Sequence, residues 1–139
     1  MSVKKFEVAI KRTVTLTDED IDDIMVSALE GGITYWCYKA EVVGDYLGKY
    51  ASEQISRGGS LKLYDFESGD KYWLTLDKFL DGFILWVEQG YDKYGAVSFN
   101  REYDESGPVY RGEVDTCMID GEAADCIIQL ALFGDVIYG

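Results

Sequence analysis

Three apolar stripes with the spacing of amphipathic helices divide this chain, and each one lies between an acidic residue and a glycine. The stripes start at Asp18, Asp77 and Asp120, where carboxylates suit the positive end of a helix. They end at glycines, residues that commonly terminate helices: Gly31, Gly90 and Gly134. The starts lie 59 and 43 residues apart, which is too irregular for a repeat protein. The segments between them must therefore cover three different helices.

Those segments carry strand patterns. Apolar residues alternate from Phe6 to Leu16, which predicts a long half-buried strand. In all, we predict strands at residues 6–16, 33–43, 61–66, 71–76, 114–119 and 135–139. Residues 67–70 form the turn of a hairpin, and residues 44–60 form a loop with a helical turn near residues 51–55. The pattern predicts a single α+β domain over residues 1–139, in which about three helices pack on one face of a largely antiparallel sheet.

Residues 91–112 exceed the usual length of a connection in a compact domain. We expect either a long β-hairpin or a mobile arm here. The aromatic side chains of this segment suit contacts with a ligand or a neighbouring subunit. A tolerated insertion without a role is the other interpretation.

The chain contains no histidine, which excludes catalysis by an imidazole base and metal binding by imidazole. Its three cysteines have neither disulfide nor zinc-site spacing, so we expect reduced thiols at Cys37, Cys117 and Cys126. Two or three of four carboxylates near the third stripe offer ligands for Mg²⁺ or Ca²⁺: Asp115, Asp120, Glu122 and Asp125. Capping and the helix dipole account for Asp120 and Glu122 without a metal. We predict no enzyme, cofactor or metal, with a metal-dependent phosphodiesterase as a distant alternative.

The acidic side chains number 26 and the basic ones 13, which gives a net charge of −13. Residues 1–16 carry +3, residues 17–30 carry −6, residues 31–65 are neutral and residues 66–139 carry −10. This balance disfavours direct nucleic-acid binding, because neutralising phosphates supplies most of that affinity. Two interpretations of the acidic surface stay open: it keeps a small protein soluble, or it imitates a nucleic acid in the basic groove of a partner.

The neutral middle of the chain holds our candidate ligand site. Its aromatic side chains can stack on a base, its cations can bind phosphate, and its paired glycines let backbone N–H groups approach an anion. The predicted ligand-binding residues are Tyr35, Trp36, Lys39, Arg57, Gly58, Gly59, Lys62 and Tyr64. The combination favours a nucleotide-like ligand. Because the spacing matches no phosphate-binding motif, aromatic residues in the sheet core and a tight turn at the glycines remain the alternative.

Three stretches resemble known proteins: TLTDEDIDDIMVSALEGGITYWC at 15–37, YASEQISRGGSLKLYD at 50–65 and ALFGDVIYG at 131–139. They resemble a family of small acidic proteins encoded by phages, prophages and other mobile elements of Firmicutes-type bacteria. That family has no established catalytic motif, so the resemblance assigns no residue a role. What it implies is a context, because small non-enzymatic phage proteins often antagonise bacterial antiviral defence.

In this context we expect a sponge that sequesters a nucleotide-derived immune signalling molecule in an electropositive, aromatic cavity. The alternative is an acidic DNA mimic that inhibits a restriction or CRISPR nuclease and has a basic host protein as its partner. Exposed edge strands favour a homo-oligomer in either case. We expect a cytoplasmic protein without a membrane partner, because the chain has no signal-peptide pattern and no run of about 18 apolar residues.

Overall fold

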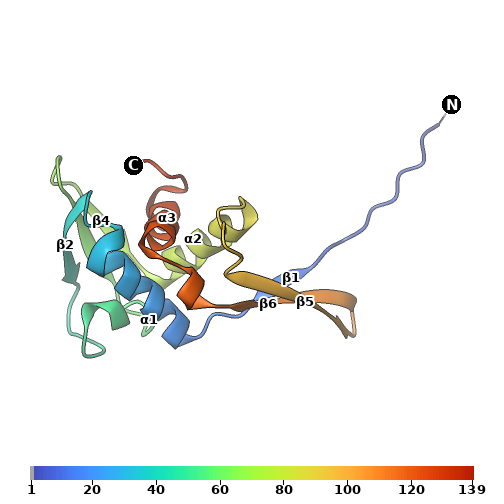
Figure 1. Ribbon diagram of the computed structural model, residues 1–139, viewed down its shortest axis with the longest axis horizontal. Helices are drawn as coiled ribbons and strands as arrows, with labels where there is room; N and C mark the ends of the chain where they lie inside the picture. The colour runs from blue at the N-terminus through green and yellow to red at the C-terminus, as the bar shows by residue number, and fades with distance from the viewer. Residues whose placement is uncertain (1) are drawn as a thin grey trace.

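A computed structural model describes residues 2–139 (Figure 1). Over this range the helices are α1 (Asp18–Ser27), α2 (Leu76–Glu88) and α3 (Gly121–Phe133), with a π-helical turn η1 (Ala28–Gly32) and 3₁₀ turns η2 (Ala51–Glu53) and η3 (Thr116–Met118). The strands are β1 (Arg12–Val14), β2 (Cys37–Val42), β3 (Leu61–Asp65), β4 (Lys71–Leu74), β5 (Val97–Asp104) and β6 (Gly107–Val114). The predicted α+β class is confirmed.

Each α-helix begins at a side-chain cap. At α1, Thr17 and Asp20 form a capping box, in which each side chain accepts the other residue's backbone N–H, at 3.1 and 3.0 Å. The side chains of Thr75 and Asp120 accept backbone N–H groups at the starts of α2 and α3. The predicted helix starts agree with the structure to within one residue.

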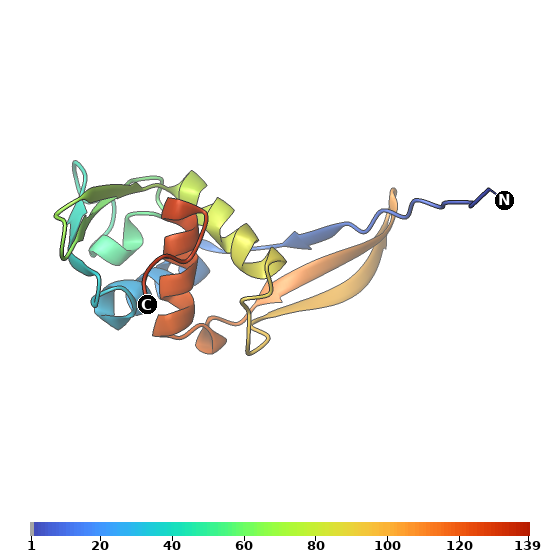
Figure 2. The same ribbon diagram turned by 90° about the horizontal axis from the view of Figure 1, so that it is seen from above.

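The strands are divided between two sheets, where the sequence predicted one. In the first sheet β2, β3 and β4 pair antiparallel in that order. In the second, β6 lies between β5, which is antiparallel to it, and β1, which is parallel to it. Residues 91–112 contain β5 and most of β6, which pair antiparallel. Of the two alternatives for this segment, a long β-hairpin or a mobile arm, the structure has the hairpin. This hairpin projects from the part of the molecule that holds the helices (Figure 2).

One core joins the three helices to the β2-β3-β4 sheet. Its largest fully buried side chains are Trp86, Phe79, Ile24, Met25, Ile33, Ile55, Leu61, Leu63, Leu74, Ile127, Ile128 and Leu130. Helices α2 and α3 approach closely at Gly82, where an added Cβ would lie 2.6 Å from the backbone nitrogen of Ala131. Within residues 2–139 no helix is long and apolar enough to cross a membrane.

Three strand predictions were wrong. Only Arg12–Val14 pairs within the expected strand 6–16, and the register with β6 leaves residues 6–8 beyond Gly107, where β6 begins. Residues 114–119 contain the end of β6 and then η3, where the Cys117 N–H donates to the Asp115 carboxylate at 3.1 Å. The expected edge strand at 135–139 is irregular, because its N–H groups at Ile137 and Tyr138 donate to the Gln129 side chain at 2.8 Å each.

Candidate functional site

The outer face of the β2-β3-β4 sheet carries alternate residues of its three strands. Their neighbours on the inner face, such as Leu61, Leu63 and Leu74, are fully buried in the core. The strand register places Lys39, Tyr64 and Lys71 in one row and Glu41, Lys62 and Trp73 in the next. We call these six residues the basic-aromatic face.

Ammonium groups lie over both rings of the basic-aromatic face. The Nζ atoms of Lys39 and Lys71 lie 5.3 and 5.6 Å from the centre of the Tyr64 ring. The Nζ atom of Lys62 lies 4.7 Å from the centre of the Trp73 ring. These distances fit cation–π pairs. Three ammonium groups against one carboxylate give the face a net charge of +2, on a chain whose net charge is −13.

Glu41 connects the two rows. Its carboxylate pairs with Lys39 at 3.0 Å and with Lys62 at 3.8 Å, and it accepts the Tyr64 hydroxyl at 3.2 Å. The bond with Glu41 raises the pKa of Lys39, and the same bond lowers the pKa of Glu41. Partial burial and Glu41 raise the pKa of Tyr64. These shifts keep all three groups in their ordinary ionisation states at neutral pH, so the face is suited to binding rather than to proton transfer.

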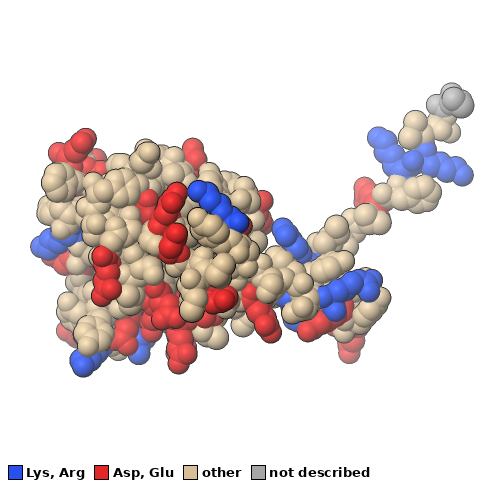
Figure 3. All heavy atoms as spheres, viewed as in Figure 1, with Lys and Arg blue, Asp and Glu red and all other residues tan. Residues whose placement is uncertain are grey.

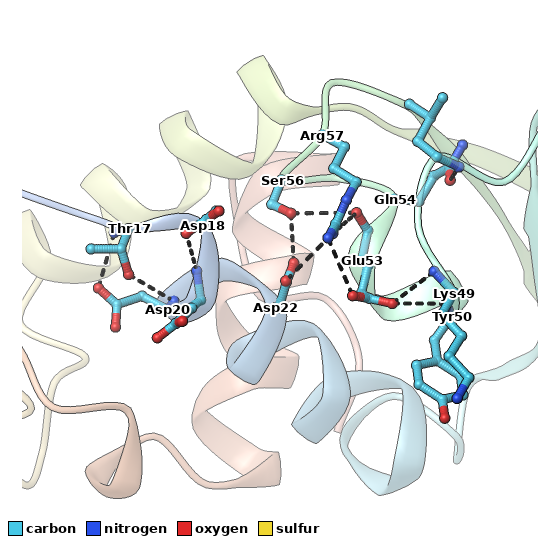
Figure 4. Close-up of polar contacts among 12 residues, drawn as sticks. Thr17, Asp18, Asp20, Asp22, Lys49, Tyr50, Glu53, Gln54, Ser56 and Arg57 are labelled. Carbon is cyan, nitrogen blue, oxygen red and sulfur yellow. Dashed lines mark hydrogen bonds and ion pairs between the residues drawn. The ribbon is translucent and has the colours of Figure 1, made fainter.

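Three of the eight predicted ligand-binding residues lie on this face, namely Lys39, Lys62 and Tyr64. Arg57 lies instead between α1 and η2, 3.6 Å from Asp22 and 3.4 Å from Glu53 (Figure 4). Gly58 has a φ of +85° in a turn, and a Cβ at Gly59 would lie 2.5 Å from the Gln54 side chain. These glycines therefore serve a tight turn, and Arg57 is neutralised by two carboxylates.

The predicted residues Tyr35 and Trp36 belong to a polar network around α3. The Asp125 carboxylate accepts the Tyr35 hydroxyl at 2.7 Å, the Trp36 indole N–H at 2.8 Å and the Gln129 amide at 3.0 Å. The Trp36 ring is buried and stacks on Tyr138, with 4.7 Å between ring centres. Burial and the Asp125 carboxylate raise the pKa of Tyr35 to about 12. Trp36 is therefore a core aromatic residue.

Glu41, Lys71 and Trp73 are the residues of the basic-aromatic face that the sequence analysis did not predict. The sequence KYWL alternates, so Lys71 and Trp73 lie on the face opposite to the buried Leu74. A short turn after β3 makes β4 its antiparallel neighbour. These two local signals together were sufficient to place both residues beside Lys62 and Tyr64.

A separate cavity of about 500 Å³ is lined by α2, α3, the loop after α2 and the last residues of the chain. Aromatic rings form much of its wall: Tyr35, Trp86, Tyr91, Tyr94 and Tyr138. Four carboxylates also line it: Asp92, Asp120, Glu122 and Asp125. Its lining includes one cation, Lys93, which is paired with Glu122 at 3.4 Å. The cavity is thus aromatic and acidic, whereas an electropositive, aromatic cavity was expected. The cations that lie beside aromatic rings are on the basic-aromatic face, which is an open sheet surface.

Metal and thiol chemistry find little support. Among residues 2–139 no three or more Cys, Asp or Glu side chains converge as a metal site would require. Burial raises the pKa of the Cys37 thiol, and burial beside Asp125 raises that of Cys126 to about 11. Both thiols are therefore protonated at neutral pH and are poor nucleophiles.

Comparison of this chain with protein-family models, curated proteins and solved structures finds no match. The basic-aromatic face and the cavity are the two features of the molecule whose geometry and charge bear on function.

Proposed function

We propose that this protein is a non-catalytic binding protein that holds a phosphate-bearing nucleotide on its basic-aromatic face. In the context that the family resemblance implies, the ligand is a nucleotide-derived immune signal, and the protein acts as a sponge for it. The observation that carries the proposal is the position of three ammonium groups around the half-buried Tyr64 ring and the exposed Trp73 ring, on a chain that is otherwise strongly acidic.

The mode of binding follows from the two kinds of group. A base that stacks on Tyr64 or Trp73 displaces an ammonium group from the ring toward the phosphate. Stacking contributes about 1–3 kcal/mol per base. An exposed cation–π pair contributes about 0.5–1 kcal/mol, so the exchange favours the ligand. Glu41 repels phosphate from the β2 edge, and we therefore expect the phosphate near Lys71 on β4.

The test is isothermal titration of ADP and of a cyclic dinucleotide, cyclic di-AMP, onto the purified protein. We expect Lys71→Ala to weaken binding by about tenfold, the loss of one phosphate contact. Lys49→Ala is the matched control, because its ammonium lies over Tyr50 at 5.3 Å outside the basic-aromatic face. Equal weakening by both substitutions, or binding of neither nucleotide, would contradict the proposal.

The DNA-mimic alternative has one observation in its favour. The Thr116 hydroxyl donates to Asp23 at 2.9 Å, which places the acidic helix α1 beside the acidic residues that follow β6. Carboxylates gather on the surface of the helical part of the molecule (Figure 3). The test is association with a basic nuclease in about 50 and 300 mM NaCl. Salt-sensitive binding that Glu19→Gln weakens and Lys71→Ala leaves unchanged would favour the mimic.

A further inference from the structure

Residues 2–11 form an extended segment that continues from β1 away from the helices (Figures 1 and 2). Apolar side chains alternate along it, and they are almost fully open to solvent: Phe6 and Val8 are each 85% exposed and Ile10 is 73% exposed. Such alternation is typical of a strand with one buried face. An exposed strand of this kind is a site for pairing with another chain.

Its own chain cannot cover this segment. In the parallel register of β1 and β6, Arg12 lies opposite Tyr110, so β6 begins at the level of residue 9. Residues 2–8 extend beyond it. The segment also leaves the molecule on the side away from α3, which contributes to the wall of the cavity (Figure 2).

Charge indicates a second copy of this chain as the partner. Residues 1–16 carry +3, and residues 17–139 carry −16, because the segments 17–30, 31–65 and 66–139 contribute −6, 0 and −10. Figure 3 shows the same separation, with Lys and Arg side chains gathered on the N-terminal segment and carboxylates on the helical part. A basic segment of one copy is therefore complementary to the acidic part of another.

The cavity complements the segment in two respects. Its aromatic walls suit the apolar side chains of the segment. Its carboxylates outnumber its one lysine by three, which suits the lysines of the segment.

We propose that the N-terminal segment of one copy binds in the acidic, aromatic cavity of a second copy. Ten extended residues span about 33 Å, which is enough to reach from one molecule into the next. The apolar residues Phe6, Val8 and Ile10 lie against the cavity's rings, and the lysines face its carboxylates. This exchange makes the protein a self-associating chain, whatever ligand the basic-aromatic face binds.

Self-association is measured first, by sedimentation velocity of the full chain between about 2 and 100 µM. We expect association that the pair Phe6→Ser and Val8→Ser weakens at least about tenfold, because it removes the apolar contacts. Ala9→Ser changes the opposite side of the same segment and is the matched control. A wild-type chain that stays monomeric, or a serine pair that associates as well as the control, would overturn the proposal.

Cross-linking then identifies the contact. Tyr94 lines the cavity and is 60% exposed, so a Lys4→Cys copy and a Tyr94→Cys copy, each also carrying Cys117→Ser, have one accessible thiol at each end of the proposed contact. We expect a bismaleimide to join residue 4 of a ¹⁵N-labelled copy to residue 94 of an unlabelled copy, as mass spectrometry of the linked peptides can show. Linkage of residue 4 only to residue 4 would overturn the proposal, because the segments would then pair with each other.

Discussion

Asp65 connects the turn between β3 and β4 to the end of the chain. One oxygen of its carboxylate accepts the backbone N–H groups of Glu67 and Ser68, at 2.8 Å each, and the other accepts the Tyr138 hydroxyl. The Tyr138 bond is the largest cause, and these bonds together lower the pKa of Asp65 to about 2. In the unfolded chain the pKa of an Asp carboxyl is about 4. Because the folded protein holds the pKa of Asp65 below this value, the Asp65 carboxylate stabilises the fold above about pH 4. This stabilisation is lost as the pH falls toward about 2.

Tyr138→Phe tests this linkage. Without the hydroxyl, the pKa of Asp65 moves back toward its ordinary value, so the free energy of unfolding should fall less between about pH 5 and pH 2.5 than in the wild type. Urea unfolding at the two pH values gives the measurement. Tyr103→Phe, on an exposed ring of the hairpin, is the control. An unchanged pH dependence in Tyr138→Phe would show that this bond does not set the acid limit.

The three thiols should differ in reactivity. Cys117 is exposed, Cys37 is buried with a raised pKa, and Cys126 has a pKa of about 11. A disulfide reagent attacks thiolates that it can reach, so we expect one fast reaction per chain at about pH 8. In denaturant, all three thiols should react fast. Loss of the fast phase in Cys117→Ser would verify the assignment, and two fast thiols in the native protein would contradict it.

The candidate site was partly predictable from individual residues. Lys39, Lys62 and Tyr64 were found because an acidic chain with a locally neutral region keeps cations there. Arg57 looked equally available, but it pairs with Glu53 four residues earlier and with Asp22 35 residues earlier, so it is not a free cation. Ion pairs between segments distant in sequence leave no local signal.

At the scale of elements, Gly82 sets how closely α2 and α3 pack. Intrinsic propensity favours Ala over Gly in a helix by about 1 kcal/mol. A Cβ at Gly82, however, would lie 2.6–2.7 Å from backbone and side-chain atoms of Ala131. Overpacking of a core costs about 1–3 kcal/mol, so we expect Gly82→Ala to destabilise the protein despite its better propensity.

Urea unfolding gives the free energy of unfolding of Gly82→Ala, and Asp81→Ala on the exposed side of α2 is the control. A more stable Gly82→Ala would mean that the helices separate at little cost.

The elements that the sequence predicted correctly depend on local interactions. The caps at Thr17 and Asp120 and the terminating glycine Gly134, with φ of +70°, are signals within a few residues of each helix end. Strands need partners that the sequence does not specify. Residues 6–16 alternate as a strand should, yet β6 supplies a partner only near β1. Residues 135–139 form no strand, because the backbone N–H groups of Ile137 and Tyr138 donate to the Gln129 side chain on α3.

At the scale of the whole molecule, charge is separated between two parts. The N-terminal segment is basic, while the helical part is crowded with carboxylates (Figure 3). Like charges within the helical part repel one another and favour expansion of the chain. In the proposed contact, the same charges attract the N-terminal segment of another copy. We therefore expect added salt to screen two effects of opposite sign, because it would stabilise each folded chain and weaken the proposed contact between chains.

The two effects separate in the Phe6→Ser and Val8→Ser chain, which we expect to be monomeric. Its melting temperature should rise when KCl is raised from about 20 to 500 mM, since the Debye length then falls well below about 10 Å. A gain of about 1 kcal/mol corresponds to about 4 °C for a chain of this length. Glu19→Gln in the same background removes one of the repelling charges on α1 and should reduce the rise. A melting temperature that falls with salt would mean that the ion pairs of the folded chain, such as Arg57 with Asp22, outweigh the repulsion among its carboxylates.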